Sequence, residues 1–348
     1  MFIETTTSIH DVCSDIWYTV FQYFETIELF TTLTHITNAA DRVLFNENGH
    51  FHLRGLILDE HLEDLPMEIP LDRVISLTLH DSCRLDLIEQ CPKIRSLKLF
   101  GAVEWMRSHI KKIAHQNIKV EQLTLVIPGI TSLSELLLPI LSNFSLRRLE
   151  ICADDLKDSC KICDLHLLPN SIQQFVLRSS SVFECDDLLY FLPHLTSIRL
   201  LDIGLITRNK KSVPSFNFPN LRTLILGLLE VSFDWIIQLM ETIPFLVKLK
   251  LTGLVDEEGF VVNDRWIDLF KSAHTLARVY VHLSLEQNDK SYSCEKLQNR
   301  LHAFNLQFRC DNDNDNDCYQ YNGNAHRWWT LKGIIIRPSD HLQRDAKS

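Results

Sequence analysis

A pattern of apolar residues that recurs every 20 to 30 positions constrains the fold of this chain more than any other feature. The pattern is an apolar residue, two residues of any kind, a second apolar residue, one residue of any kind and a third apolar residue. Ten copies end at Leu58, Leu79, Leu99, Leu125, Ile151, Leu177, Leu200, Leu226, Leu251 and Val281, and a weaker eleventh copy ends at Leu306. This period predicts a repeat protein in which stacked units bury one continuous core.

Each copy predicts one short strand followed by a helix. The last two apolar residues of a copy are two positions apart, so their side chains project from the same face of a strand. Segments between copies, such as 233–240 and 264–270, place apolar residues at helical spacing behind a polar start. Stacking such units predicts an α/β solenoid, with a parallel sheet on its concave face and helices on its convex face.

These repeats resemble the leucine-rich-repeat family over residues 53–308. The resemblance implies the α/β solenoid fold of that family. In the family an asparagine or cysteine follows each copy three residues later, whereas Ser82, Ala102, Pro128 and Asp154 are among the residues at these places here. The chain therefore resembles the irregular, asparagine-poor members of the family.

Residues 12–45 lack the repeat pattern and show helical apolar spacing instead. Ser14, Thr26 and Asn38 are polar residues placed to cap three short helices. Three helices of this length bury too little apolar surface to be stable alone. The segment therefore needs the first repeat or another protein beside it.

The stretch 15–30 resembles an F-box, a helical module that docks on the Skp-type adaptor of cullin-based ubiquitin ligases. The residues that match its positions, with two more at its opening, are Val12, Cys13, Ile16, Val20, Phe21, Phe24, Leu29 and Phe30. Cys13 stands where the family has proline. The resemblance implies that these residues form an adaptor-binding module. An F-box followed by leucine-rich repeats is an order common among substrate receptors of such ligases. The alternative is a helical cap that only covers the first repeat.

The predicted organisation is a helical module at residues 8–48, a repeat array of 10 or 11 units at 49–310, and an acidic loop with a terminal cap or tail at 311–348. The hydrophobic fraction of 45% is that of a chain with a substantial core. The first residues have no signal-peptide pattern, and the most apolar stretch, 133–146, is too short to cross a bilayer. We therefore expect a soluble protein of the cytoplasm or nucleus that does not bind membranes.

No motif in the sequence predicts catalysis, so we expect neither enzyme activity nor a cofactor. Cys160 and Cys163 have a metal-like spacing but lack a second ligand pair, which favours free thiols over a zinc site. The alternating Asp and Asn residues at 311–317 lack the glycine and the closing glutamate of a calcium loop. Trp328 and Trp329 are expected to pack over the last repeat. The net charge of −10 argues against nucleic acid as a partner.

The sequence also predicts a basic inner face on the sheet. The residues before, between and after the last two apolar residues of each copy are expected on the exposed side of the strands. Seven of these 33 positions are basic, and they are Lys98, Arg148, Arg178, Arg199, Lys248, Lys250 and Arg278. Only Asp59 and Glu150 are acidic there, although the chain has 45 acidic and 35 basic residues. Since Arg and Lys bind carboxylates and phosphates, we expect this face to bind an acidic or phosphorylated protein segment; the alternative is a solvated face with a chance excess of cations.

Taken together, the sequence predicts a non-catalytic substrate receptor of a cullin-type ubiquitin ligase. The helical module would bind the Skp-type adaptor, and the repeats would hold an unknown protein substrate. The alternative is a leucine-rich-repeat scaffold for protein–protein interaction that has no association with a ubiquitin ligase.

Overall fold

The chain folds into two compact units that both combine helices with strands. The computed structural model describes residues 8–45, 51–59, 69–81, 85–116, 118–131, 140, 145–156, 171–179, 182–184, 197–207, 218–255, 258–286, 306–310 and 328–336. One unit contains Met1–Gly129 and Leu136–Leu146, and the other contains Ile130–Glu135 and Arg147–Ser348. Their strands are mostly parallel, which confirms the predicted α/β class.

The first unit has parallel strands that follow one another in chain order. They are β1 (Leu56–Leu58), β2 (Ser76–His80), β3 (Ser96–Phe100) and β4 (Gln122–Thr131). Leu77 lies beside Leu97, and Leu97 lies beside Leu123, so buried leucines line up from strand to strand. This alignment is the one that the apolar pattern predicts.

The length of a repeat decides what connects its strands. Leu79 and Leu99 are 20 positions apart, and the connection between β2 and β3 holds the short 3-10 helix η3 (Leu85–Gln90). Leu99 and Leu125 are 26 positions apart, which leaves room for the 13-residue helix α4 (Val103–His115) between β3 and β4. A short 3-10 helix, η2 (Leu71–Arg73), precedes β2. The prediction of a full helix after each strand is therefore wrong for the shorter repeat after β2.

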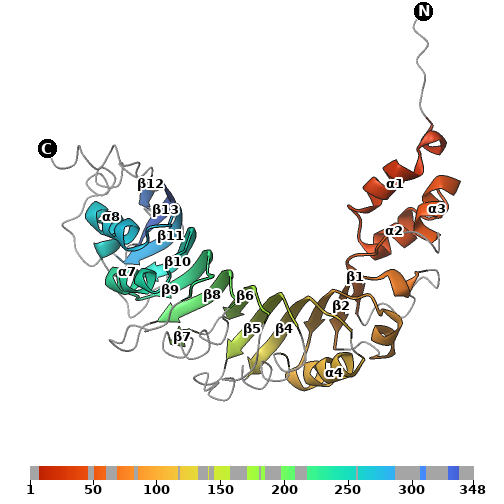
Figure 1. Ribbon diagram of the computed structural model, residues 1–348, viewed down its shortest axis with the longest axis horizontal. Coiled ribbons are helices and arrows are strands. Elements are labelled where there is room, and N and C mark those ends of the chain that lie inside the picture. Colours follow the sequence, from red (N-terminus) through yellow and green to blue (C-terminus); the bar gives the residue numbers. More distant parts are fainter. Residues whose placement is uncertain are drawn as a thin grey trace, which may run out of the picture. The chain divides into compact units, whose positions relative to one another are not determined.

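Among the described residues of the second unit there are seven parallel strands and an antiparallel pair. The parallel strands are β5 (Arg148–Leu156), β6 (Gln174–Ser179), β8 (Leu200–Thr207), β9 (Thr223–Leu229), β10 (Lys248–Val255) and β11 (Arg278–Glu286), with the short β7 (Phe183–Glu184) beside β8. Helices α7 (Phe233–Glu241) and α8 (Asn263–Ser272), with the 3-10 helix η5 (Glu258–Val261), lie on one side of these strands (Figure 1). Both α-helices match the segments predicted from apolar spacing.

An aromatic cluster joins these helices to one another. The rings of Phe233, Phe260 and Trp266 meet edge to face, and all three are fully buried. The Trp266 indole Nε1 donates a hydrogen bond to the Phe260 carbonyl oxygen at 3.0 Å, so burial leaves no polar group of that ring unpaired. The cluster therefore holds α7, η5 and α8 together as one layer.

In several repeats, one carbonyl bonds to two consecutive N–H groups of the next repeat. In the second unit the carbonyl of Arg199 accepts from the N–H groups of Arg222 and Thr223, and the carbonyl of Arg222 accepts from those of Val247 and Lys248. The same arrangement joins Ile75 to Arg95 and Ser96 in the first unit. Because these bonds lie at the start of each strand, they fix its register against the neighbouring strand.

The structure corrects the frame of the seventh copy of the pattern. From the sequence, this copy consists of Leu195, Ile198 and Leu200. In the structure Leu201 lies beside Phe175 and Ile203 lies beside Leu177, and both are buried, whereas Leu200 is only partly buried. Ile198, Leu201 and Ile203 satisfy the pattern equally well, and burial of Leu201 and Ile203 against the aligned columns selects this frame.

The last strands also differ from the prediction. β12 (Leu306–Cys310) and β13 (Trp328–Ile336) are antiparallel to each other, and β13 lies between β11 and β12. The predicted eleventh copy, which ends at Leu306, is therefore not a further parallel repeat. Buried Leu331 and Ile335 lie beside Leu283 and Val279, so β13 extends the core across the last parallel strand.

The N-terminal segment forms the three predicted helices, α1 (Ser14–Phe21), α2 (Thr26–Thr32) and α3 (Asn38–Phe45), after the short 3-10 helix η1 (Ile9–Asp11). The predicted caps Ser14 and Thr26 are wrong by one residue, because Cys13 and Glu25 hold the cap positions. Glu25 forms a reciprocal capping box with Glu28. The Thr37 hydroxyl accepts from the N–H of Ala40 at the start of α3.

Polar and aromatic contacts anchor these helices to the first repeat. Both the N–H and the hydroxyl of Thr26 donate to the Arg54 carbonyl, and the Arg73 guanidinium Nη1 donates to the Leu44 carbonyl at 3.0 Å. Phe21 packs edge-on against Phe51. The helices are thus part of the first unit rather than a separately packed module.

We predict that Arg73→Met loosens α3. Arg73 is almost fully buried, and its loss leaves the Leu44 carbonyl without this donor, at a cost of about 1–3 kcal/mol. Amide hydrogen exchange in α3 should therefore become faster by about 5- to 150-fold. Arg222→Met is the matched control, because Arg222 also donates to a carbonyl, that of Phe245, but is exposed and lies in the other unit. Unchanged exchange in α3 of the Arg73→Met variant would contradict the anchoring role.

Candidate protein-binding surfaces

Among the described residues of the second unit, α7, η5 and α8 cover one face of the sheet (Figure 1), and we call the opposite face the open face. On each strand the residues of the open face alternate with the buried leucine, isoleucine and valine residues. Lys250, for example, is exposed between the fully buried Leu249 and Leu251. Register then determines which side chains of the open face become neighbours.

Lys98, the one predicted basic residue in the first unit, has no basic neighbour in register. It is exposed on β3 between Thr78 of β2 and Thr124 of β4. The structure therefore does not place it in a basic row within its unit.

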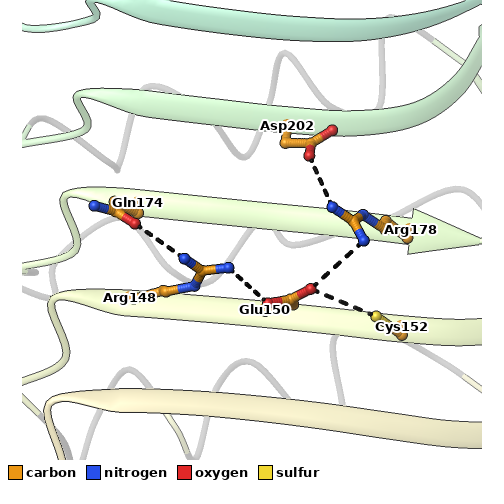
Figure 2. Close-up of polar contacts among 6 residues, drawn as sticks. All are labelled: Arg148, Glu150, Cys152, Gln174, Arg178 and Asp202. Atoms are coloured by element: carbon orange, nitrogen blue, oxygen red, sulfur yellow. Dashed lines mark hydrogen bonds and ion pairs between the residues drawn. The ribbon is translucent and has the colours of Figure 1, made fainter. Parts of the chain in front are cut away.

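Arg148 and Arg178 lie on the open face, but both are paired with acidic residues (Figure 2). The Arg148 guanidinium donates to the Glu150 carboxylate at 2.9 Å and to the Gln174 side-chain oxygen at 3.4 Å. The Arg178 guanidinium donates to the Asp202 carboxylate at 3.3 Å and lies 3.9 Å from the Glu150 carboxylate. We call these four charged residues the charge network.

The charge network leaves little positive charge for a ligand. Its two carboxylates, with side chains 15% exposed, are each held by one or both arginines, so the charges cancel in pairs. The hydrogen bond to Asp202, followed by smaller contributions from the nearby carboxylates, raises the pKa of Arg178 despite the opposing effect of its partial burial. This part of the predicted basic face therefore stabilises the sheet internally.

Arg199 is exposed but does not belong to the open face. In the corrected frame it lies immediately before β8, where its carbonyl and N–H take part in the bonds that join successive repeats. The open-face positions of β8 include Leu200 and Asp202 instead. The sequence analysis missed Asp202 because the predicted copy ended at Leu200, which placed Asp202 beyond the expected open-face positions.

The remaining predicted cations, Lys248, Lys250 and Arg278, lie together on β10 and β11. Register places them in a three-by-three set of open-face positions, with three residues from each of β10, β11 and β13. We call this set the basic grid, and it consists of Lys248, Lys250 and Thr252, of Arg278, Tyr280 and His282, and of Ile336, Ile334 and Lys332. The sequence analysis missed Lys332, because the strand that carries it, β13, was not predicted. Only the alternation of inward and outward positions at Leu331, Lys332 and Gly333 would have indicated it.

The eight residues of the predicted adaptor-binding module divide into a buried and an accessible group. Phe21, Leu29 and Phe30 are buried in the core of the helices. Cys13 and Ile16 are exposed, and Val12, Val20 and Phe24 are partly exposed. The sequence missed three further exposed apolar residues nearby, Ile9, Tyr18 and Tyr23, the last of which is 84% exposed.

Within the ranges that the structure describes, no group of side chains is arranged to hold a metal ion. Cys160, Cys163 and the acidic run 311–317 lie outside these ranges, as do the side chains of Trp328 and Trp329. No described helix has both the length and the apolar character needed to cross a membrane.

We predict that Arg178 and Asp202 are energetically coupled. In a double-mutant cycle with Arg178→Met and Asp202→Asn, urea unfolding should give a coupling energy of about 0.5–1 kcal/mol, because the Arg178 side chain is largely exposed. High salt should reduce the coupling, since it screens the two charges. The control pair Arg178→Met and Lys250→Met should be additive, and additivity of Arg178→Met with Asp202→Asn would rule the coupling out.

Comparisons with known proteins do not assign a family to this chain. No protein-family model matches it, and no curated protein matches it. The resemblances to F-box and leucine-rich-repeat proteins therefore rest on the residues named above, and the geometry of the two surfaces is the basis for a functional proposal.

Proposed function

We propose that this chain is a non-catalytic substrate receptor of a cullin-type ubiquitin ligase. In this proposal the N-terminal helices bind a Skp-type adaptor, and the open face of the repeats holds a protein substrate through an acidic or phosphorylated segment. The observation that carries the proposal is a concentration of exposed apolar side chains on and around α1.

Four of the nine large apolar side chains that are exposed in the described part of the chain lie between Ile9 and Tyr23. Exposed apolar residues that gather in one place are typical of protein-binding surfaces. Cys13, Ile16 and Val20 follow helical spacing along α1, and Tyr23 lies just beyond the end of this helix. These four residues form an exposed apolar stripe, which has the geometry of a surface that binds another protein.

The packing of the N-terminal helices favours this surface over a plain cap. A segment that only caps a repeat array needs one apolar face towards the repeats and a polar outer face. Here Phe21, Leu29 and Phe30 already supply a buried core, and Ile16 remains 53% exposed. The alternative, a scaffold with no ubiquitin-ligase association, draws support from the anchoring of the helices to the first repeat through Thr26 and Arg73.

We predict that Ile16→Asp with Tyr23→Asp abolishes co-purification with a co-expressed Skp-type adaptor. The substitutions place charges in the exposed apolar stripe, while both side chains are far enough from full burial for the helices to remain folded. Phe21→Ala is a poor test, because Phe21 is 1% exposed and its loss would damage the core of the helices themselves.

Phe245→Asp with Val247→Asp is the matched control. These residues are also large, apolar and exposed, but they lie in the second unit. The control should leave adaptor co-purification unchanged. If the unaltered chain is folded and does not retain the adaptor, the ligase proposal is wrong and the scaffold alternative is favoured.

A further inference from the structure

We infer that the basic grid is the substrate-binding site, and that its ligand is a protein segment that carries several Asp or Glu residues next to an apolar residue. The inference rests on the proposed receptor function and names the substrate class. It follows from the charges that the register brings together and from the apolar side chains at one corner of the grid.

The grid combines four cations with a central aromatic ring. Lys248 and Arg278 are direct neighbours in register, and Lys250, Tyr280 and Ile334 form the middle row. Lys332 lies beside His282 in the third row. With strands about 4.8 Å apart and alternate residues about 7 Å apart, the nine positions cover about 10 by 14 Å, which is the length of a few extended residues.

The cations of the grid repel one another. Like charges directly opposite each other on neighbouring strands are destabilising, and this applies to Lys248 and Arg278. None of the nine positions holds an acidic residue. The Lys248 ammonium lies 4.7 Å from the centre of the Tyr280 ring, which offers only a weak attraction compared with a carboxylate.

The charge network on the same face shows the contrast. There, Glu150 and Asp202 alternate with the arginines and neutralise them. Open-face residues of β9, Thr223 and Ile225, carry no charge and separate the network from the grid. Among the described residues, the grid therefore keeps a positive charge that an anionic ligand would neutralise.

The arrangement of the charges favours a run of carboxylates over one phosphate. A single phosphate is best bound by converging groups, and Arg is suited to it because it donates two parallel hydrogen bonds. Here three of the four cations are lysines, and Lys332 stands at the corner opposite Lys248. Such a spread matches charges distributed along a peptide.

The apolar corner favours a protein segment over nucleic acid. Ile334 and Ile336 are 44% and 61% exposed beside Tyr280 and Arg278, and they would contact an apolar side chain. A base that entered the grid would need an aromatic ring to stack on, as is usual for single strands. The Tyr280 ring already packs against the Lys248 ammonium.

The test measures binding of a fluorescein-labelled peptide of about ten residues, with four Glu and one Leu, to the purified full chain by fluorescence anisotropy. Lys248→Glu with Arg278→Glu should weaken binding by at least about tenfold. Lys98→Glu with Arg199→Glu changes the net charge equally at exposed positions outside the grid, and should leave binding unchanged. A peptide with Gln in place of Glu should not bind.

Ile334→Ser probes the apolar corner without disturbing the core. It should weaken binding of the Leu-containing peptide several-fold and leave a peptide with Ser in place of Leu unaffected. If the grid variant (Lys248→Glu with Arg278→Glu) and the control variant (Lys98→Glu with Arg199→Glu) lose the same peptide affinity, the site is wrong, because binding would then respond to net charge alone. Tighter binding of a peptide with one phosphoserine and no Glu, of an oligonucleotide or of phosphatidylserine vesicles would overturn the ligand class.

Adaptor co-purification separates this inference from the proposed function. The Lys248→Glu and Arg278→Glu variant should still retain the Skp-type adaptor, because the substitutions lie in the other unit from the N-terminal helices. If the chain retains the adaptor but no acidic peptide binds, only the substrate class is wrong. If acidic peptides bind and the adaptor does not, the site stands and the ligase proposal fails.

Discussion

The two hydrogen bonds that one carbonyl in each of several repeats accepts from the next repeat are the constraint on which the structure of each unit depends. The carbonyls of Arg147, Gln173, Arg199, Arg222 and Val247 follow one another in this role through the second unit. Each bonded pair starts the next strand at the same level as its neighbour. Buried side chains then meet in straight columns, and the core continues from strand to strand.

The same alignment makes the open face a set of rows in which each residue has defined neighbours. An arginine on the open face therefore has opposite effects on the local net charge in different places. Arg178 stands next to Glu150 and Asp202 and becomes part of an internally neutral network, whereas Arg278 stands next to Lys248 and adds to an unneutralised one. The number of cations on the face matters less than which residues share a row.

Most of the strands and helices could be predicted from the sequence, because burial requires apolar residues at fixed spacing. The frame of the apolar pattern around β8 and the charge of the open face could not be predicted. Ile198 fits both possible frames around β8, and only the alignment of Leu201 with Phe175 and of Ile203 with Leu177 decides which residues are buried. The wrong frame removed Asp202 from the face and added Arg199, so the sequence overestimated the basic surface.

For the N-terminal helices the apolar spacing identified the residues but not their roles. The sequence assigned Ile16 and Phe21 to one apolar face of α1, but in the structure Phe21 is buried whereas Ile16 is 53% exposed. Phe21 contacts Phe51 of the first repeat. Lys332 escaped detection for another reason, since β13 was not predicted as a strand, and the residues that it buries, Leu331 and Ile335, do not follow the spacing of the repeat pattern.

The reversed order of the last two strands has a consequence for how the second unit assembles. β12 precedes β13 in the chain, yet in the described sheet it pairs only with β13, which in turn pairs with β11. The earlier segment must therefore wait for the later one before it can join the sheet. Until residues 328–336 pair with it, the outer edge of β11 remains open to the backbone of any other strand, which exposes a folding chain to mispairing at this edge.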